Sequence, residues 1–242
     1  MVIKDDLPDD GTSTGASGAM TGSPRREPIF NAPLVAILTA VSIPALFIVQ
    51  GELPDGGFSL AFRPSSLADG QWWPGLFTAM VLHAGWTHAL MNAAGAIAFG
   101  PPVARLMPGV RGALGFLLFY MACSVAAVLG YGLLHIGSHD IVVGASGAVF
   151  GLTGAAMRLL GRRDGRLRAL TDRRLLGISA ILMVANLVLG LAGTLPGGAG
   201  PVAWEAHAFG YLFGLLAIGP WARIFRGRSG FDSRADPGDP PI

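Results

Sequence analysis

The sequence contains long stretches without a single Asp, Glu, Lys or Arg residue, and this pattern restricts the fold more than any other feature. Six such stretches occur, of 24, 35, 28, 17, 30 and 17 residues. A helix needs about 20 apolar residues to cross a ~30 Å hydrocarbon core, and in lipid only helices and closed barrels satisfy every backbone group. Because the stretches lack the alternation of barrel strands, they predict an all-α, polytopic membrane protein.

Six transmembrane helices are expected from these stretches. Their approximate ranges are 33–50, 76–100, 112–134, 146–160, 175–193 and 204–221. The predicted organisation is a disordered cytoplasmic tail over residues 1–30, a six-helix membrane domain over residues 31–225 and a flexible cytoplasmic tail over residues 226–242. The first stretch follows a polar leader and has no clear cleavage site after it, which disfavours a cleavable signal peptide.

The composition excludes several other classes of protein. Hydrophobic types make up 52% of the chain and charged types 13%, against about 25% charged residues in an ordinary soluble domain. That balance excludes a disordered chain. The single cysteine, Cys123, excludes a disulfide framework and a multi-cysteine zinc site, and it is interpreted as a small packing residue. The formal net charge of +2 gives no indication of nucleic-acid binding.

Arginines flank the expected helices unevenly. One side of the predicted membrane carries only Arg63. The other side carries Arg25, Arg26, Arg105, Arg111, Arg158, Arg162, Arg163, Arg166, Arg168, Arg173, Arg174, Arg223, Arg226 and Arg228. The positive-inside rule therefore predicts a multi-pass protein of the plasma (inner) membrane with both termini in the cytoplasm, as an even number of spans requires. The cluster at 158–174 is also suited to contact anionic lipid.

Polar residues interrupt the apolar stretches at a few positions, where they are costly and usually functional. The second stretch carries His83, His88 and Asn92, and the last two share one helix face because they are four residues apart. The fourth stretch opens with Ser146 in the segment G-A-S-G. The sixth carries His207 close to its outer end.

Helix length places Ser146 below the outer membrane surface. A helix over residues 146–160 would be only ~22 Å long at ~1.5 Å per residue, short of the ~30 Å core. The non-helical segment 137–145 before it would then lie partly at membrane depth. That is tolerated only where the backbone lines a water-filled cavity or is buried in protein. Ser146 and His207 are therefore expected at a similar depth, in a wet pocket.

Small residues would let the fourth and sixth helices approach closely. Gly210 and Gly214 form a G-x-x-x-G pattern within about 60° of His207 on a helical wheel. The fourth helix offers Gly147, Gly151 and Gly154. The contact face and the imidazole thus point the same way, which predicts that Ser146 meets His207.

A serine beside a histidine supports nucleophilic catalysis, because the histidine accepts the hydroxyl proton and returns it to the leaving group. No Asp or Glu is expected at depth, since Glu205 points elsewhere on its helix, so the pattern predicts a Ser–His dyad. Phe150, one turn below Ser146, is placed to hold the imidazole by ring stacking. Asn92, His88 and the Ser146 backbone N–H at the helix N-terminus are the candidate donors to an oxyanion.

These motifs resemble those of the rhomboid family of intramembrane serine proteases. The resemblance covers about residues 33–221 and rests on H-x-x-x-x-H-x-x-x-N (His83, His88, Asn92), G-x-S-G (Gly144 to Gly147) and A-H-x-x-G-x-x-x-G (Ala206 to Gly214). It implies a six-transmembrane-helix rhomboid-like bundle. It also implies Ser146 as nucleophile, His207 as base, and His88, Asn92 and the Ser146 backbone as the oxyanion hole. The supporting residues are Gly144, Gly147, Phe150, Gly210 and Gly214.

The segment 51–73 corresponds in this resemblance to an outer loop that lies against the bilayer, and His83 to a structural histidine near the cavity. The sequence departs from the family pattern at one point. Many members carry Trp-Arg just before the second transmembrane helix, whereas here Trp72 and Trp73 are followed by Pro74 and Gly75. The departure concerns the stability and lipid contacts of this loop and not the chemistry.

The sequence therefore predicts a serine endopeptidase that cleaves transmembrane proteins in or near their spans. Its expected partners are transmembrane protein substrates and membrane lipids, with no cofactor, no metal and no nucleic acid. The main alternative is a rhomboid-like pseudoprotease that binds membrane clients without cleavage, disfavoured because Ser146 and His207 are both present. A transporter or channel is disfavoured because no intramembrane charge or inverted repeat is visible.

A metal site is also disfavoured. His135 and His139 have the i, i+4 spacing that can bind a metal on a helix, but no third protein ligand is evident. A zinc protease of the membrane would need H-E-x-x-H, and the segment from His83 to His88 has the wrong spacing and no Glu.

Overall fold

Helices dominate the computed structural model of the chain, which describes residues 33–161, 166–193 and 202–225. Within these ranges the only β feature is an isolated antiparallel bridge between Phe62 and Val142. The two predicted tails, residues 1–30 and 226–242, lie outside the described residues and stay predictions.

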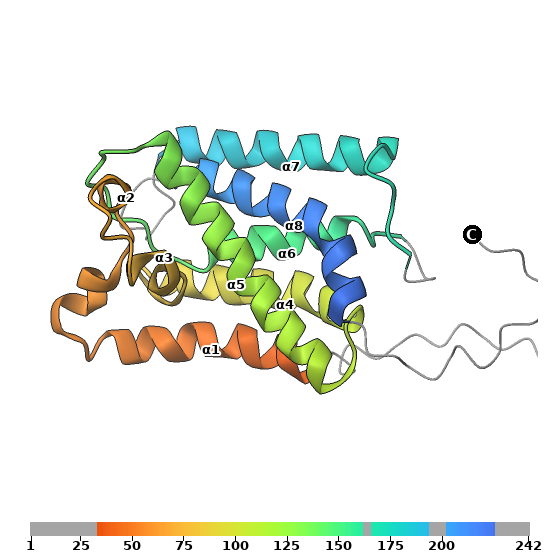
Figure 1. Cartoon of the computed structure of the whole chain (residues 1–242), viewed down its shortest axis with the longest axis horizontal. Coiled ribbons are helices and arrows are strands. Elements are labelled where there is room, and N and C mark those ends of the chain that lie inside the picture. Colours follow the sequence, from red (N-terminus) through yellow and green to blue (C-terminus); the bar gives the residue numbers. More distant parts are fainter. Residues whose placement is uncertain (1–32, 162–165, 194–201, 226–242) are drawn as a thin grey trace, which may run out of the picture. The chain divides into compact units, whose positions relative to one another are not determined.

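Six longer helices correspond in order to the six predicted transmembrane stretches (Figure 1). They are α1 (Leu34–Gln50), α4 (Trp86–Arg105), α5 (Gly109–Leu134), α6 (Ser146–Met157), α7 (Arg173–Leu191) and α8 (Trp204–Phe225). Between α1 and α4 lie the short helices η2 (Pro54–Leu60), α2 (Ser65–Ala68), α3 (Gly75–Thr78) and η3 (Ala79–Val81). Among the described residues, α5, α7 and α8 are long and apolar enough to cross a membrane, and α1 and α6 are apolar but shorter. The all-α membrane class is confirmed.

Several helix boundaries differ from the prediction by two to five residues, and the start of the second transmembrane helix differs by ten. The second transmembrane helix was expected to begin at residue 76, but α4 begins at Trp86. The Gln50 side chain, at the end of α1, bonds both backbone groups of His83: Oε1 accepts from its N–H at 2.7 Å and Nε2 donates to its carbonyl at 3.0 Å. Because these groups bond across to α1, no helix continues through them. The fourth helix ends at Met157, before the expected residue 160.

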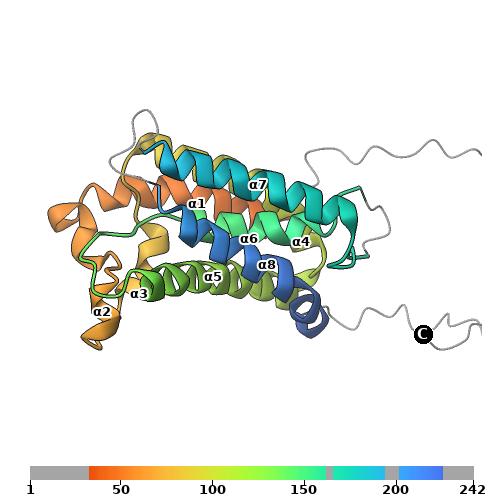
Figure 2. The same ribbon diagram turned by 90° about the horizontal axis from the view of Figure 1, so that it is seen from above.

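Helix α6 occupies the centre of the packing. It contacts α4, α5 and α8, and Figures 1 and 2 both show it among these helices. Every residue of α6 is buried except Ser146 and Phe150. Helix α7 is the opposite case, because only Leu175 and Asn186 are buried along its length. At 12 residues, α6 is about 18 Å long at ~1.5 Å per residue.

Glycines bring α6 and α8 together backbone to backbone. A Cβ atom added at Gly210 would overlap the Gly147 carbonyl oxygen, and one added at Gly214 would overlap the Gly151 carbonyl oxygen. From the other side, a Cβ at Gly154 would overlap the Tyr211 carbonyl oxygen. The close approach predicted from the G-x-x-x-G pattern is thus present, and it needs glycine on both helices.

The segment between α1 and α4 packs on the C-terminal half of α5 through an apolar cluster separate from the main core. Phe62, Leu76, Ala79 and Val128 are its buried members. In the same segment the side chains of Trp72 and Trp73 are 43% and 68% exposed. Exposed tryptophans suit a membrane–water interface, and contact of this segment with the bilayer stays a prediction.

Replacing Gly214 with alanine is expected to destabilise the fold, because the new methyl group has no space against the Gly151 carbonyl. Overpacking of this kind costs about 1–3 kcal/mol. Thermal unfolding in detergent, followed by circular dichroism, measures the loss.

The matched control is Gly177→Ala, on the exposed face of α7, where a Cβ meets nothing within 4 Å. This change is expected to leave the unfolding temperature unchanged or to raise it, since alanine favours a helix by about 1 kcal/mol over glycine. Equal behaviour of the two variants would contradict the packing account.

Candidate active site

Ser146 and His207 meet at the interface of α6 and α8. Ser146 is the first residue of α6 and His207 lies in the first turn of α8, and 2.8 Å separates Ser146 Oγ from His207 Nε2. Both side chains are half-buried. This is hydrogen-bond distance, the geometry in which an imidazole can take the proton of a hydroxyl.

Phe150 holds the face of the imidazole ring. Its ring stacks on that of His207 with the centroids 4.3 Å apart and the planes 5° from parallel. Phe150 lies one turn after Ser146 on α6, so the nucleophile candidate and the stacking ring come from the same rigid helix. The sequence predicts Phe150 in this position.

Asn186 of α7 is a member of the site that the sequence pattern did not predict. Its Oδ1 lies 2.9 Å from His207 Nδ1, and its Nδ2 donates to the Trp204 carbonyl at 2.8 Å. Glu205 is not the partner of this ring, since its carboxylate lies 3.3 Å from His135 Nε2. The expected pair thus has a third polar member, an amide and not a carboxylate. A single asparagine within the apolar stretch 175–193 was the available sign.

Gly144 permits close contact between the backbone before Ser146 and the ring of His88. Gly144 has φ +120°, a backbone conformation that residues other than glycine rarely adopt. A Cβ atom there would lie 2.5 Å from His88 Cε1. The Gly144 N–H donates to the Ala79 carbonyl at 2.8 Å, which anchors this segment to η3. His88 is therefore positioned beside the chain that leads into Ser146.

Asn92 lies one turn after His88 on the same face of α4. It is buried, and its Nδ2 donates to the His88 carbonyl at 3.0 Å. An amide nitrogen carries two hydrogens, so one N–H remains for another acceptor. The oxyanion roles of His88, Asn92 and the Ser146 backbone stay predictions.

His83 supports the loop that precedes α6. Its Nε2 accepts from the Ala145 N–H at 3.4 Å, and its ring packs against the ring of His88 with centroids 5.2 Å apart. His83 also lines a cavity of about 270 Å³ between α1 and α5, together with Thr39, Ser42 and Tyr120. These contacts fit a structural part for His83.

His135 and His139 bind different partners. His135 Nε2 lies beside the Glu205 carboxylate, and His139 Nδ1 lies 3.2 Å from the Ser65 hydroxyl. Within the described ranges, no three His, Cys, Asp or Glu side chains are grouped closely enough to hold a metal ion.

A helical membrane bundle with a Ser–His pair at the start of a central helix defines the class of this protein, and sequence comparisons give the family. Residues 69–223 match the sequence model of the Rhomboid domain. The chain belongs to the rhomboid family.

Three curated relatives carry the family name. "Putative rhomboid protease YdcA" of Bacillus subtilis is 34% identical over 113 residues, 47% of this chain and 51% of the relative. "Rhomboid-like protein 11, chloroplastic" of Arabidopsis thaliana is 32% identical over 151 residues, 60% of this chain and 51% of the relative. "Rhomboid protease GluP" of Bacillus subtilis is 33% identical over 129 residues, 53% of this chain and 23% of the relative. The chain thus spans about half or less of the length of these relatives.

Proposed function

We propose that this protein is an intramembrane serine endopeptidase that cleaves transmembrane protein substrates. The observation that carries the proposal is the 2.8 Å contact between Ser146 Oγ and His207 Nε2, made at the start of a helix that is largely buried in the bundle. Two of the relatives bear the name rhomboid protease, which agrees with this chemistry.

The reaction would begin with attack of Ser146 Oγ on a peptide carbonyl carbon while His207 Nε2 takes the hydroxyl proton. His207 then gives this proton to the departing amine, leaving an acyl-enzyme ester on Ser146. Water, deprotonated by the same nitrogen, hydrolyses the ester and restores the hydroxyl. Phe150 keeps the imidazole plane fixed through both transfers.

The negative charge on the tetrahedral intermediate would be bound by three donors, one of them on Ser146 itself. Ser146 begins α6, so its own N–H has no acceptor within the helix, and the helix N-terminus carries partial positive charge. The second N–H of Asn92 and the ring of His88 are the further donors proposed. The substrate helix must unwind near the cleaved bond, because in a helix its carbonyls are already hydrogen-bonded.

Replacing Ser146 with alanine is expected to abolish cleavage of a model transmembrane substrate and covalent labelling by a fluorophosphonate probe, because both need the Oγ nucleophile. Labelling of the purified protein in detergent, read on a gel, is the measurement. Ser42→Ala on α1, whose hydroxyl bonds its own helix, is the control and should label like the wild type.

Two results would contradict this proposal. Retained cleavage in the Ser146→Ala variant would exclude Ser146 as the nucleophile. A wild-type protein that binds membrane clients but neither labels nor cleaves would favour the pseudoprotease alternative.

Asn92→Ala is expected to lower kcat with little change in KM, because an oxyanion donor acts mainly in the transition state. Removal of one such donor lowers kcat about 10²–10³-fold. Steady-state cleavage of the model substrate measures the effect. Thermal unfolding of the variant is the companion measurement, since Asn92 is buried. An unchanged kcat at normal stability would remove Asn92 from the oxyanion hole.

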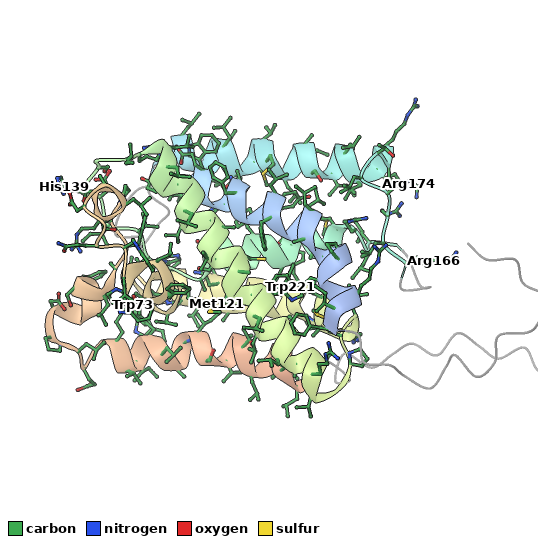
Figure 3. The ribbon with its side chains drawn as sticks, in the orientation of Figure 1. Trp73, Met121, His139, Arg166, Arg174 and Trp221 are labelled. Carbon is green, nitrogen blue, oxygen red and sulfur yellow. The ribbon has the colours of Figure 1, made fainter. Side chains whose placement is uncertain are left out.

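We also propose that the protein lies in the plasma (inner) membrane with the arginine-rich end in the cytoplasm, in contact with anionic lipid. Figure 3 supports this orientation, with Trp73 and His139 at one end of the helices and Arg166 and Arg174 at the other. Cytoplasmic surfaces are enriched in arginine and interfaces in tryptophan.

A pair of cysteine variants tests the orientation. In a Cys123→Ala background, which removes the only native cysteine, His139→Cys should react with a membrane-impermeant maleimide on intact cells. Arg174→Cys should react only after permeabilisation. Both positions are exposed, and the reverse labelling pattern would contradict the proposed topology.

A further inference from the structure

Asn186 is a polar side chain in a place where the surrounding helix has no packing reason for one. It is 3% exposed, and the only other buried residue of α7 is Leu175. Most of α7 presents apolar side chains outward, and Figure 1 shows the helix running alongside α8. A buried polar group in a membrane helix is costly unless it is hydrogen-bonded, and it is usually functional.

The two hydrogen bonds of Asn186 fix which way its amide points. A carbonyl oxygen can only accept, so the group 2.8 Å from the Trp204 carbonyl must be the NH₂ of Asn186. The amide oxygen therefore faces His207 Nδ1 at 2.9 Å. Turning the amide over would set its oxygen against the Trp204 oxygen, which is repulsive.

The orientation of the amide determines the tautomer of His207. An amide oxygen accepts a hydrogen bond and cannot donate one, so Nδ1 must carry the hydrogen. In the neutral ring Nε2 is then the unprotonated nitrogen, and it is the one 2.8 Å from Ser146 Oγ. An asparagine whose NH₂ faced the ring would select the opposite tautomer and leave Nε2 unable to take a proton.

We propose that Asn186 is the positioning residue of the catalytic pair: it holds His207 as the Nδ1–H tautomer and directs Nε2 at Ser146, with the Trp204 carbonyl setting the sense of the amide. The inference rests on the proposed protease function for its kinetic consequences, but the tautomer itself is a property of the resting protein. Asn186 touches neither the substrate nor the attacked bond and acts through the imidazole alone.

Helix α7 supplies its own control residue. Ser179 Oγ lies 2.6 Å from the Tyr211 hydroxyl, a second hydrogen bond between α7 and α8 that does not involve His207. A purely structural role of Asn186, joining α7 to α8, would make Asn186→Ala and Ser179→Ala similar in effect. A positioning role predicts a much larger loss of kcat in Asn186→Ala than in Ser179→Ala.

The kinetic experiment compares cleavage of the model transmembrane substrate by Asn186→Ala, Ser179→Ala and the wild type. Asn186→Ala is expected to lower kcat about 10- to 100-fold with KM within about twofold, the effect of losing one hydrogen bond to a ring that becomes charged during the reaction. Ser179→Ala should stay within about twofold in kcat. Equal kcat losses in the two variants, or an unchanged kcat in Asn186→Ala, would overturn the proposal.

The pH dependence of kcat/KM in Asn186→Asp distinguishes a positioning role from a structural role, because a structural role would not change it. A carboxylate accepts the same bond from Nδ1–H but has no hydrogen to donate to the Trp204 carbonyl, so the variant should lose some stability. Measured below its unfolding temperature, it should retain activity at neutral and alkaline pH. Because the negative charge favours the protonated imidazole, the acidic limb of the kcat/KM profile should shift to higher pH. Among the described residues, His88 is the titratable group whose charge acts on His207, and Glu205 is paired with His135. Both are unchanged in this variant. An unshifted acidic limb would count against Asn186 as the partner of Nδ1.

A final measurement is independent of catalysis. The ¹⁵N shifts of the ring, recorded on histidine-labelled protein in the Ser146→Ala background and assigned with a His207→Gln variant, should report a protonated Nδ1. Addition of Asn186→Ala should mix the tautomers. If Nε2 carries the hydrogen instead, the positioning proposal fails. If wild-type Ser146 does not label while Nδ1 is protonated, the protease proposal fails and the positioning geometry stands.

Discussion

The contact between α6 and α8 without intervening side chains is the constraint on which the rest of the site depends. Ser146 and His207 are 61 residues apart in the chain, and a 2.8 Å contact between their side chains requires the two helix backbones to be close. Gly147 and Gly210 meet within one turn of the pair, and Gly151 and Gly214 meet one turn further on. Without a hydrophobic driving force between helices in lipid, such packing contributes much of the association.

The side chains around Ser146 and His207 also hold the backbone segments that carry this pair. Phe150 belongs to the same rigid helix as Ser146, so stacking on His207 also fixes the distance between serine and histidine. Gly144 lets His88 lie close to the chain before α6, and His83 supports the same segment through the Ala145 N–H. The loop into α6 is therefore held by His88 of α4 and by His83 just before α4, whereas His207 of α8 is held by Phe150.

The sequence predicted the all-α membrane class and the approximate positions of the long helices, because absence of charge over about 20 residues is a local property that lipid imposes. It also placed Ser146, Phe150 and His207 near one another, since helix length and the glycine spacing restrict how two helices can meet. The start of α4 was not predictable in this way. It depends on the Gln50 side chain, which bonds the backbone of a residue 33 positions away.

Asn186 escaped prediction for a different reason. The other residues of the α7 stretch are largely apolar on every side, so their pattern does not say which face turns toward α8. Only the packed structure shows that the asparagine faces His207.

The polar side chains around Ser146 have a consequence for biogenesis. His207 as the Nδ1–H tautomer, Asn186, Asn92 and Ser146 itself are all neutral, and Glu205 lies at the entry of α8 beside His135. A charged residue at the centre of an inserting helix costs about 2.5–3.5 kcal/mol. The chain can therefore enter the bilayer segment by segment without transferring a catalytic carboxylate into hydrocarbon. Charge would arise at the site only transiently, once a peptide bond is under attack.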